Sequence, residues 1–256
     1  MAHSPAAVML SFGSPAPFAS RIKAAGVKLI CQVQNMEHAR AAVDVDADII
    51  VAQGAEAGGH GLVRTTFTLV PEIADYLAKA APATVLVAAG GVADGRGLAA
   101  ALMLGAEGAL IGSRFWASAE ALVRAAFQKA AIDADGDATT RTTVVDIVRN
   151  IGWPKPFTAR VMKTSFVNEW HGREAELTEP PLIEREMNRY LTAMQSGDPD
   201  NTGVWVGKAA GLINDVRPAA DLLQKIVADA ERLLGAKAPC LVRVPKATAR
   251  STSDIP

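Results

Sequence analysis

Cysteine is scarce in this sequence, and the two that occur lie far apart. They are Cys31, within an apolar run, and Cys240, in the polar C-terminal stretch. A disulfide framework or a zinc site needs Cys or His residues at characteristic spacings, and none is present, so neither is predicted. We interpret the pair as one buried and one surface thiol, which is typical of a reducing compartment.

Neither sign of charge is in excess. Lys and Arg number 26 and Asp and Glu number 27, so the formal net charge is −1. Nucleic-acid-binding proteins usually carry an excess of basic residues, so the balanced charge argues against a nucleic-acid-binding protein. No apolar run reaches the roughly 18 residues of a membrane-spanning helix. Residues 1–5 also lack the start of a secretory signal. We therefore expect a cytoplasmic protein with a small-molecule substrate, acting on neither nucleic acid nor membranes.

Half of the sequence, 50%, is hydrophobic, and in the first half the apolar residues fall into short continuous runs. Strands covered on both faces have this pattern, and their alternation with helical segments predicts an α/β fold with about five strand–helix units. The predicted strands are Val8–Phe12, Val27–Val33, Asp48–Ala52, Val85–Ala89 and Ala109–Ile111. The predicted helices are 18–25, 37–43, 69–80, 94–104 and 118–130, with Pro71 in the first turn of the third.

The second half of the chain has a different pattern. A polar stretch at 133–143 is interpreted as a loop, and helices are predicted at 144–151 and from 179 to about 194. An apolar stripe at helical spacing predicts a core-facing helix over 221–234. The predicted organisation is an incomplete barrel at 1–130, a helical region at 131–205, a returning helix at 206–236 and a loose tail at 237–256.

Three strand ends are rich in glycine and lie at the carboxyl edge of the predicted sheet, where such folds bind ligands. They are 53–61 (QGAEAGGHG), 90–95 (GGVADG) and 110–114 (LIGSR). Glycine allows a backbone to approach a ligand closely, and a following helix N-terminus favours an anion. His60 lies in the first of these loops and lacks a second ligand at metal spacing. His3, His38 and His171 are interpreted as a terminal residue, a helix-surface residue and an interdomain packing residue.

In this order, the three motifs resemble the nitronate monooxygenase family, formerly called 2-nitropropane dioxygenase. The stretches that carry the resemblance are 53–61, 87–95 (VAAGGVADG), 105–115 (GAEGALIGSRF) and, in the second half, 170–174 (WHGRE). The resemblance extends over about residues 8–234. It implies an FMN-containing, TIM-barrel-like (β/α)8 fold with an added helical domain.

The resemblance also implies residue roles. His60 matches the histidine beside the reactive edge of the flavin, which removes the proton α to a nitro group. Positions that contact the flavin ring are matched by Gln32, Gln53, Gly58 and Gly59. Positions that hold the phosphate and ribityl chain are matched by Gly90, Gly91, Leu110, Ile111, Gly112 and Ser113.

This chain departs from the family pattern at its start. The first predicted strand, Val8–Phe12, resembles the fourth strand of the family barrel, so three strands are expected to be missing. An open sheet has two unpaired edges. We consider three outcomes: a second copy completes the sheet in a homodimer, the chain is marginally stable and aggregates, or the full protein is longer.

The leading hypothesis is an FMN-dependent enzyme that oxidises alkyl nitronates, and nitroalkanes, with O2 to carbonyl compounds and nitrite. The first alternative is an FMN- and NAD(P)H-dependent reductase of enoyl thioesters or quinones. The second is a non-catalytic flavoprotein remnant.

Overall fold

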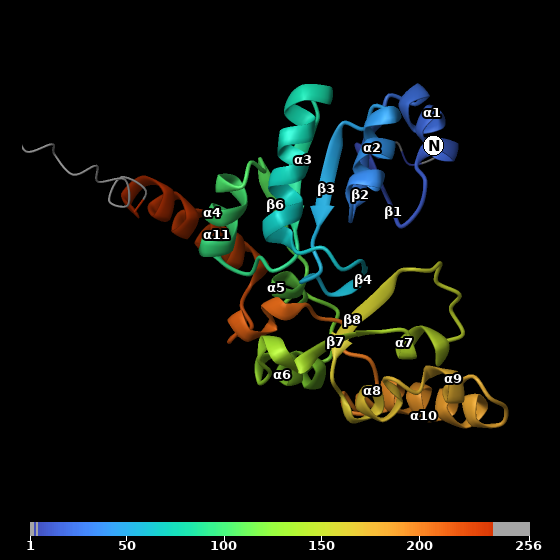
Figure 1. The fold of residues 1–256 in the computed structure, drawn as a ribbon. Helices are drawn as coiled ribbons and strands as arrows, with labels where there is room; N and C mark the ends of the chain where they lie inside the picture. The colour runs from blue at the N-terminus through green and yellow to red at the C-terminus, as the bar shows by residue number, and fades with distance from the viewer. Residues whose placement is uncertain (1–2, 4, 238–256) are drawn as a thin grey trace, which may run out of the picture.

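The computed structural model describes residues 3 and 5–237, and its centre is a parallel sheet of five strands. The strands are β1 (Ala7–Ser11), β2 (Lys28–Val33), β3 (Ile49–Gln53), β5 (Val85–Ala89) and β6 (Gly108–Leu110), in the order β1-β2-β3-β5-β6. Every neighbouring pair is parallel, so the carboxyl ends of the strands meet at one edge (Figure 1). The prediction of an α/β fold with five strand–helix units is confirmed.

Four helices accompany this sheet: α1 (Ala16–Ala24), α2 (Met36–Asp44), α3 (Thr66–Ala80) and α4 (Gly95–Met103). The largest buried core lies between the sheet and its helices, and it includes Leu29, Ile50 and Leu69, each fully buried. Burial of such side chains stabilises the unit by roughly 1.5–3 kcal/mol each. These segments form strands because their continuous apolar sequences can be buried against the helices that accompany the sheet.

Helix α3 begins earlier than the sequence predicts. The expected start at Leu69 places Pro71 in the first turn, but the helix starts at Thr66 and contains Pro71 in its interior. The physical reason is a tertiary contact, because the carboxylate of Glu56 accepts hydrogen bonds from the Thr66 backbone N–H at 2.9 and 3.1 Å. A carboxylate at this end of a helix also interacts favourably with the helix dipole.

A small antiparallel sheet, which the sequence does not predict, joins one strand from the first part of the chain to two strands from the second. Its strands are β4 (Gly59–Gly61), β7 (Thr139–Thr142) and β8 (Thr158–Met162), in the order β4-β8-β7. The stretch 133–143 is thus not a loop: it holds a 3-10 turn, η1 (Gly136–Ala138), followed by β7. The polar sequence of β7 conceals a strand whose end residues, Thr139 and Thr142, are buried by neighbouring segments.

Helices complete this part. They are α5 (Ser113–Trp116), α6 (Ala125–Ile132), α7 (Val144–Ile147), α8 (Ser165–Trp170), α9 (Glu174–Leu177), α10 (Leu182–Ser196) and η2 (Lys208–Leu212). The single helix expected over 118–130 is instead an irregular segment followed by α6, and α5 precedes both. A second core forms here around Phe166 and Tyr190, whose rings meet edge to face at 5.5 Å between centroids.

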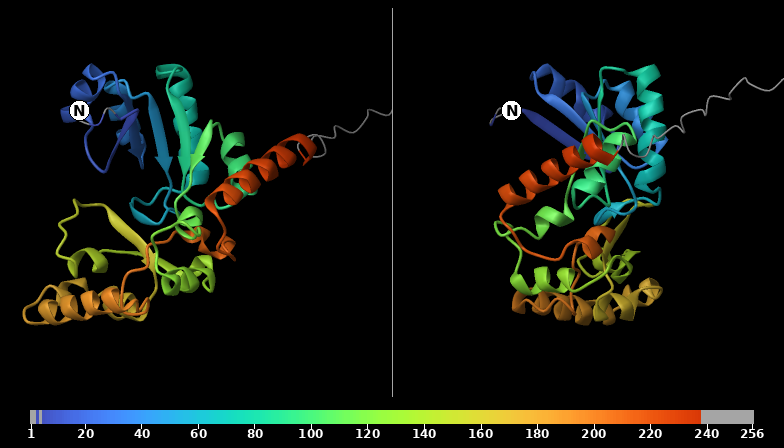
Figure 2. Two further views of the ribbon diagram at one scale, coloured as in Figure 1. Left: turned by 180° about the vertical axis from the view of Figure 1, so that it is seen from behind. Right: turned by 90° about the vertical axis from the view of Figure 1, so that its left-hand side faces the viewer.

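The last helix described, α11 (Ala219–Arg232), continues into η3 (Leu233–Lys237) and packs against α4. Contact is close, since a Cβ on Gly95 would lie 2.5 Å from the Cβ of Asp229. Both views in Figure 2 show the α11 helix beside the parallel-sheet unit, and the second part of the chain below that unit. The predicted tail at 237–256 lies outside the described residues except for residue 237, and Cys240 lies outside them.

The parallel sheet is open within the described ranges. There, β1 pairs with β2 alone and β6 pairs with β5 alone. The homodimer that would cover such an edge stays a prediction. Among the same residues no helix is both long enough and apolar enough to cross a membrane.

Candidate active site

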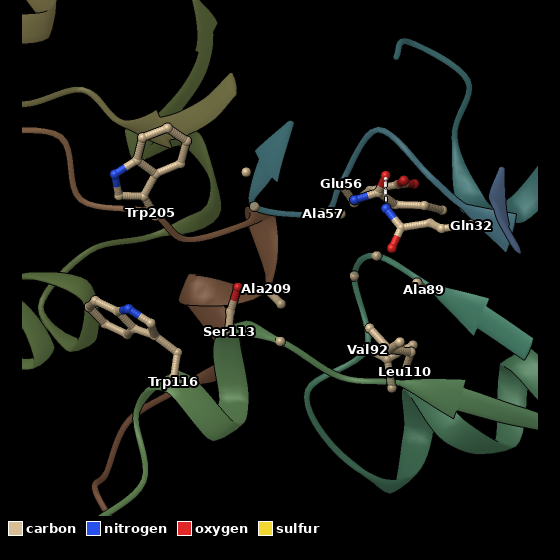
Figure 3. Close-up of a pocket in the computed structure, with 16 residues that line it drawn as sticks. Gln32, Glu56, Ala57, Ala89, Val92, Leu110, Ser113, Trp116, Trp205 and Ala209 are labelled. Carbon is tan, nitrogen blue, oxygen red and sulfur yellow. Dashed lines mark hydrogen bonds between the residues drawn. The ribbon is translucent and has the colours of Figure 1, made fainter. Parts of the chain in front are cut away.

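The three glycine-rich strand ends surround one cavity at the carboxyl edge of the parallel sheet. Figure 3 shows Gln32 and Glu56 on one side of it and Trp116 and Trp205 on the other. Nine residues predicted to bind the cofactor line it: Gln32, Gln53, Gly58, Gly59, Gly90, Gly91, Leu110, Gly112 and Ser113. Ile111 and the side chain of His60 do not line the cavity.

Glycine is required at several of these positions. Gly90 and Gly91 have φ angles of +100° and +79°, which residues with a side chain rarely adopt. A Cβ on Gly58 would lie 2.6 Å from the backbone of Val206. By contrast, a Cβ on Gly112 would have no neighbour within 4 Å, so its backbone faces open space. The loops therefore form a backbone cradle with room for a ligand.

Side-chain amides are clustered at the ends of β2 and β3. The Oε1 atom of Gln53 accepts hydrogen bonds from Gln32 Nε2 at 2.7 Å and from Gln34 Nε2 at 2.9 Å. The Nε2 atom of Gln53 donates to the backbone oxygen of His60 at 3.2 Å, which ties β3 to β4. The sequence reasoning missed Gln34, and the available signal was a second glutamine directly after an apolar strand.

Glu56 and Ser113 close the cavity from opposite sides. The Glu56 carboxylate, besides capping α3, accepts a hydrogen bond from the Thr66 hydroxyl at 2.9 Å. Ser113 Oγ accepts the backbone N–H of Gly207 at 2.9 Å, which leaves its hydroxyl proton available to a ligand. The segment around Gly207 thereby brings Trp205 to the cavity wall.

His60 lies on β4 beside the cavity and is 9% exposed. Its Nε2 atom is 2.9 Å from Oδ1 and 3.0 Å from Oδ2 of Asp146, which is also buried. The ring stacks on Trp153 with 3.4 Å between centroids and lies 5.5 Å from the Trp205 ring. Asp146 was not predicted, and its one signal was a lone acidic residue within an apolar helical stretch.

An aromatic cluster joins the two parts of the chain next to His60. Phe12, which has a φ angle of +63°, contacts the rings of Trp153 and Phe157 edge to face at 5.0 and 5.5 Å. His38 stacks on Phe157 at 5.9 Å and is half-buried, so it is not a plain helix-surface residue. Burial lowers the pKa of His38.

The other two histidines lie away from the cavity. His171 follows α8, is 45% exposed, and pairs with Glu174 at 3.4 Å, so it does not pack between domains. His3 is exposed near the N-terminus, as expected.

Two arginines hold the loop that leads to His60. Arg141 on β7 and Arg160 on β8 both donate to the backbone oxygen of Ala55, at 3.3 and 2.8 Å. Burial, together with the charge of Arg160, lowers the pKa of Arg141 to about 10. Burial likewise lowers the pKa of Arg160. Among the described residues, neither guanidinium has a carboxylate within salt-bridge distance.

The cavity fits a flat, phosphorylated cofactor such as FMN. Glycine backbones and the Ser113 hydroxyl are donors suited to a phosphate, and the Gln32 and Gln53 amides are suited to the heteroatoms of a flavin ring. The open space beside Gly112 leaves room for the group. Among the described residues, no cluster of His, Cys, Asp or Glu could hold a metal ion.

The fold and this cavity define an α/β protein of the TIM-barrel type, with a candidate ligand site at the carboxyl ends of the parallel strands. The chain belongs to the nitronate monooxygenase family, whose sequence profile matches residues 1–229.

Two curated relatives carry the name of this family, and one solved structure shares the fold. It is 38% identical over 194 residues to nitronate monooxygenase npaC of Metarhizium robertsii, covering 73% of this chain and 53% of the relative. It is 34% identical over 217 residues to a nitronate monooxygenase of Neurospora crassa, and the match covers 82% of this chain and 56% of the relative. The structure of FabK from Thermotoga maritima superposes with a TM-score of 0.78 at 30% identity, covering 92% of this chain and 71% of that one. The chain spans about half the length of the two curated relatives.

Proposed function

We propose that this protein is an FMN-dependent enzyme that oxidises alkyl nitronates with O2 to carbonyl compounds and nitrite. The observation that carries the proposal is the convergence of three glycine-rich strand ends on one cavity, in a chain of the nitronate monooxygenase family. The cavity lies directly beside His60, the residue suited to proton transfer.

The cofactor would be held mainly by backbone. Gly90, Gly91 and residues 110–113 would bind the phosphate and ribityl chain, because their N–H groups and the Ser113 hydroxyl are the donors at that end. Gln32, Gln53 and residues 58–59 would contact the ring. When bound, FMN accepts electrons from the substrate and passes them to O2.

His60 would act on the neutral nitroalkane. A nitronate is already deprotonated and needs no base, whereas a nitroalkane must first lose the proton α to its nitro group. Histidine titrates close to neutral pH and is suited to that transfer.

The parts of the chain would divide these tasks. Residues 1–130 would hold the cofactor, 131–205 would cover the substrate through Trp153 and Phe157, and 206–236 would pack back on the cofactor unit through α11. A cytoplasmic setting belongs to the same proposal, supported by a chain with two cysteines and a buried, unpaired Cys31.

The test combines reconstitution with a pair of assays. The purified chain is incubated with FMN, gel-filtered, and examined for retained flavin absorbance. Oxygen uptake with an alkyl nitronate is then compared with NAD(P)H oxidation in the presence of an enoyl thioester or a quinone. Oxygen uptake that produces nitrite supports the proposal. NAD(P)H oxidation without it would establish the reductase alternative, and a folded protein that retains no FMN would establish a non-catalytic remnant.

A further inference from the structure

The buried contact between His60 and Asp146 has no role in the function proposed so far. Asp146 lies on α7 in the second part of the chain, 86 residues from His60. Its side chain is 4% exposed, and within the described ranges His60 is its one side-chain hydrogen-bond partner. An ionised carboxylate can only accept hydrogen bonds, so Nε2 must carry the proton in this contact.

When Nε2 of the neutral His60 ring carries the proton, Nδ1 is left unprotonated. A neutral imidazole has one protonated nitrogen, and the other nitrogen then holds a lone pair. Among the described residues, Nδ1 of His60 has no hydrogen-bond partner. Asp146 therefore selects the tautomer whose free, basic atom is Nδ1.

The neighbouring rings keep this orientation in place. Trp153 stacks on His60 with an interplanar angle of 15°, and Phe12 meets the ring edge to face at 6.2 Å. Stacking holds the plane of the ring, but it does not distinguish one nitrogen from the other. The carboxylate of Asp146 makes that distinction.

We propose that Asp146 is a positioning residue that holds His60 in the Nε2–H tautomer and makes Nδ1 the atom that deprotonates nitroalkanes. In this step the C–H bond α to the nitro group breaks, its electron pair forms the C=N bond of the nitronate, and the π pair of one N=O bond moves onto that oxygen. The proton moves to Nδ1, and the Asp146 carboxylate stabilises the imidazolium. The inference rests on the proposed function for the reaction that it serves.

The first test is kinetic and uses Asp146→Asn. The amide can donate to Nε2 and reverse the tautomer, an exchange that costs about 10⁴-fold in kcat in a serine protease. We expect kcat/KM for a nitroalkane to fall about 10²- to 10⁴-fold, and that for the matching nitronate by less than about 3-fold. Asp146→Glu, which keeps the carboxylate, is expected to recover most of the nitroalkane activity. Asp133→Asn on the exposed surface is the matched control.

A double-mutant cycle tests whether Asp146 acts through His60. The variant with both His60→Ala and Asp146→Asn is expected to be no slower on nitroalkanes than His60→Ala alone, because the Asp146 effect needs the imidazole. If the loss of kcat/KM in the double variant equals the product of the losses in the two single variants, the contact is purely structural and the proposal is overturned. Equal losses on both substrates in Asp146→Asn would also overturn it.

The second test needs neither cofactor nor activity. Nitrogen-15 NMR of the four histidines, at a pH where imidazole is neutral, reports the tautomer of each ring. The His60 signal, assigned by its loss in His60→Gln, is expected to show Nε2–H in the wild-type protein. A proton on Nδ1 would mean that Asp146 is the donor and would refute the inference, even if Asp146→Asn fails to fold. A wild-type chain without nitronate oxidation would contradict the proposed function alone.

Discussion

Arg141 and Arg160 face each other across β7 and β8, and both guanidinium groups donate to the backbone oxygen of Ala55. This places one buried and one half-buried positive charge behind the loop that carries the first glycine-rich motif. Like charges so close repel each other, and the lowered pKa of both arginines reflects burial first. The loop conformation is thus held by residues 86 and 105 positions further along the chain.

Removing one of these arginines is expected to loosen the loop. Arg160→Met loses the hydrogen bonds to Ala55 and to Thr139 Oγ1, which is 3.1 Å away. The expected cost is about 1–3 kcal/mol of the free energy of unfolding, measured by urea denaturation, together with weaker FMN binding. Arg21→Met, on the exposed face of α1, serves as the control and is expected to change neither quantity. An Arg160→Met protein of wild-type stability would contradict this prediction. It would show that the free energy gained by relieving the repulsion from Arg141 is as large as the free energy lost with the hydrogen bonds.

A pair of glycine variants separates backbone strain from cofactor binding. Gly91 and Gly172 have similar φ angles, +79° and +87°, but only Gly91 lines the cavity. Alanine at either position should cost roughly 1–2 kcal/mol in stability, because both adopt a left-handed conformation. We expect Gly91→Ala alone to weaken FMN binding, measured by flavin fluorescence titration. Equal FMN affinity in the two variants would contradict the assignment of Gly91 to the cofactor site.

Gln53 is expected to be the most sensitive amide of the cluster. Gln53→Met leaves the Gln34 and Gln32 amides without their acceptor and frees the backbone oxygen of His60. An unsatisfied buried polar group costs about 1–3 kcal/mol, so the melting temperature should fall and nitronate oxidation should fall with it. Gln224→Met on the exposed face of α11 provides the comparison, and a Gln53→Met enzyme with its activity intact would be inconsistent with a role for this cluster.

Cys31 is expected to be unreactive in the folded protein. Burial raises the pKa of its thiol to about 11, so it stays protonated at neutral pH. In a Cys240→Ser background, a thiol reagent at pH 8 should modify Cys31 only at the rate of unfolding. Because the pKa of this thiol in the folded protein exceeds its ordinary value of 9.0, its contribution to stability is present below pH 9 and is lost as the pH rises toward 11. Rapid modification in the native state at pH 8 would show that the site is open.

The sequence predicted most of the parallel-sheet unit and few of the contacts around His60. Strands such as Ile49–Gln53 and Val85–Ala89 are continuous apolar runs, and the prediction matched them within a residue or two. Strand β7 was missed because its Thr and Arg residues carry no apolar pattern. It is a strand because β8, which lies beyond a connecting segment, pairs with it.

What the sequence determined by itself was the α/β alternation, the family and the three glycine-rich strand ends. Each is a local property, since an apolar run or a glycine backbone acts within a few residues. What only the tertiary structure decided was the surroundings of those residues: the Asp146 carboxylate on His60, the Gln34 amide on Gln53, and the two arginines on Ala55. These contacts join segments far apart in the chain, and their geometry exists only once both cores have formed.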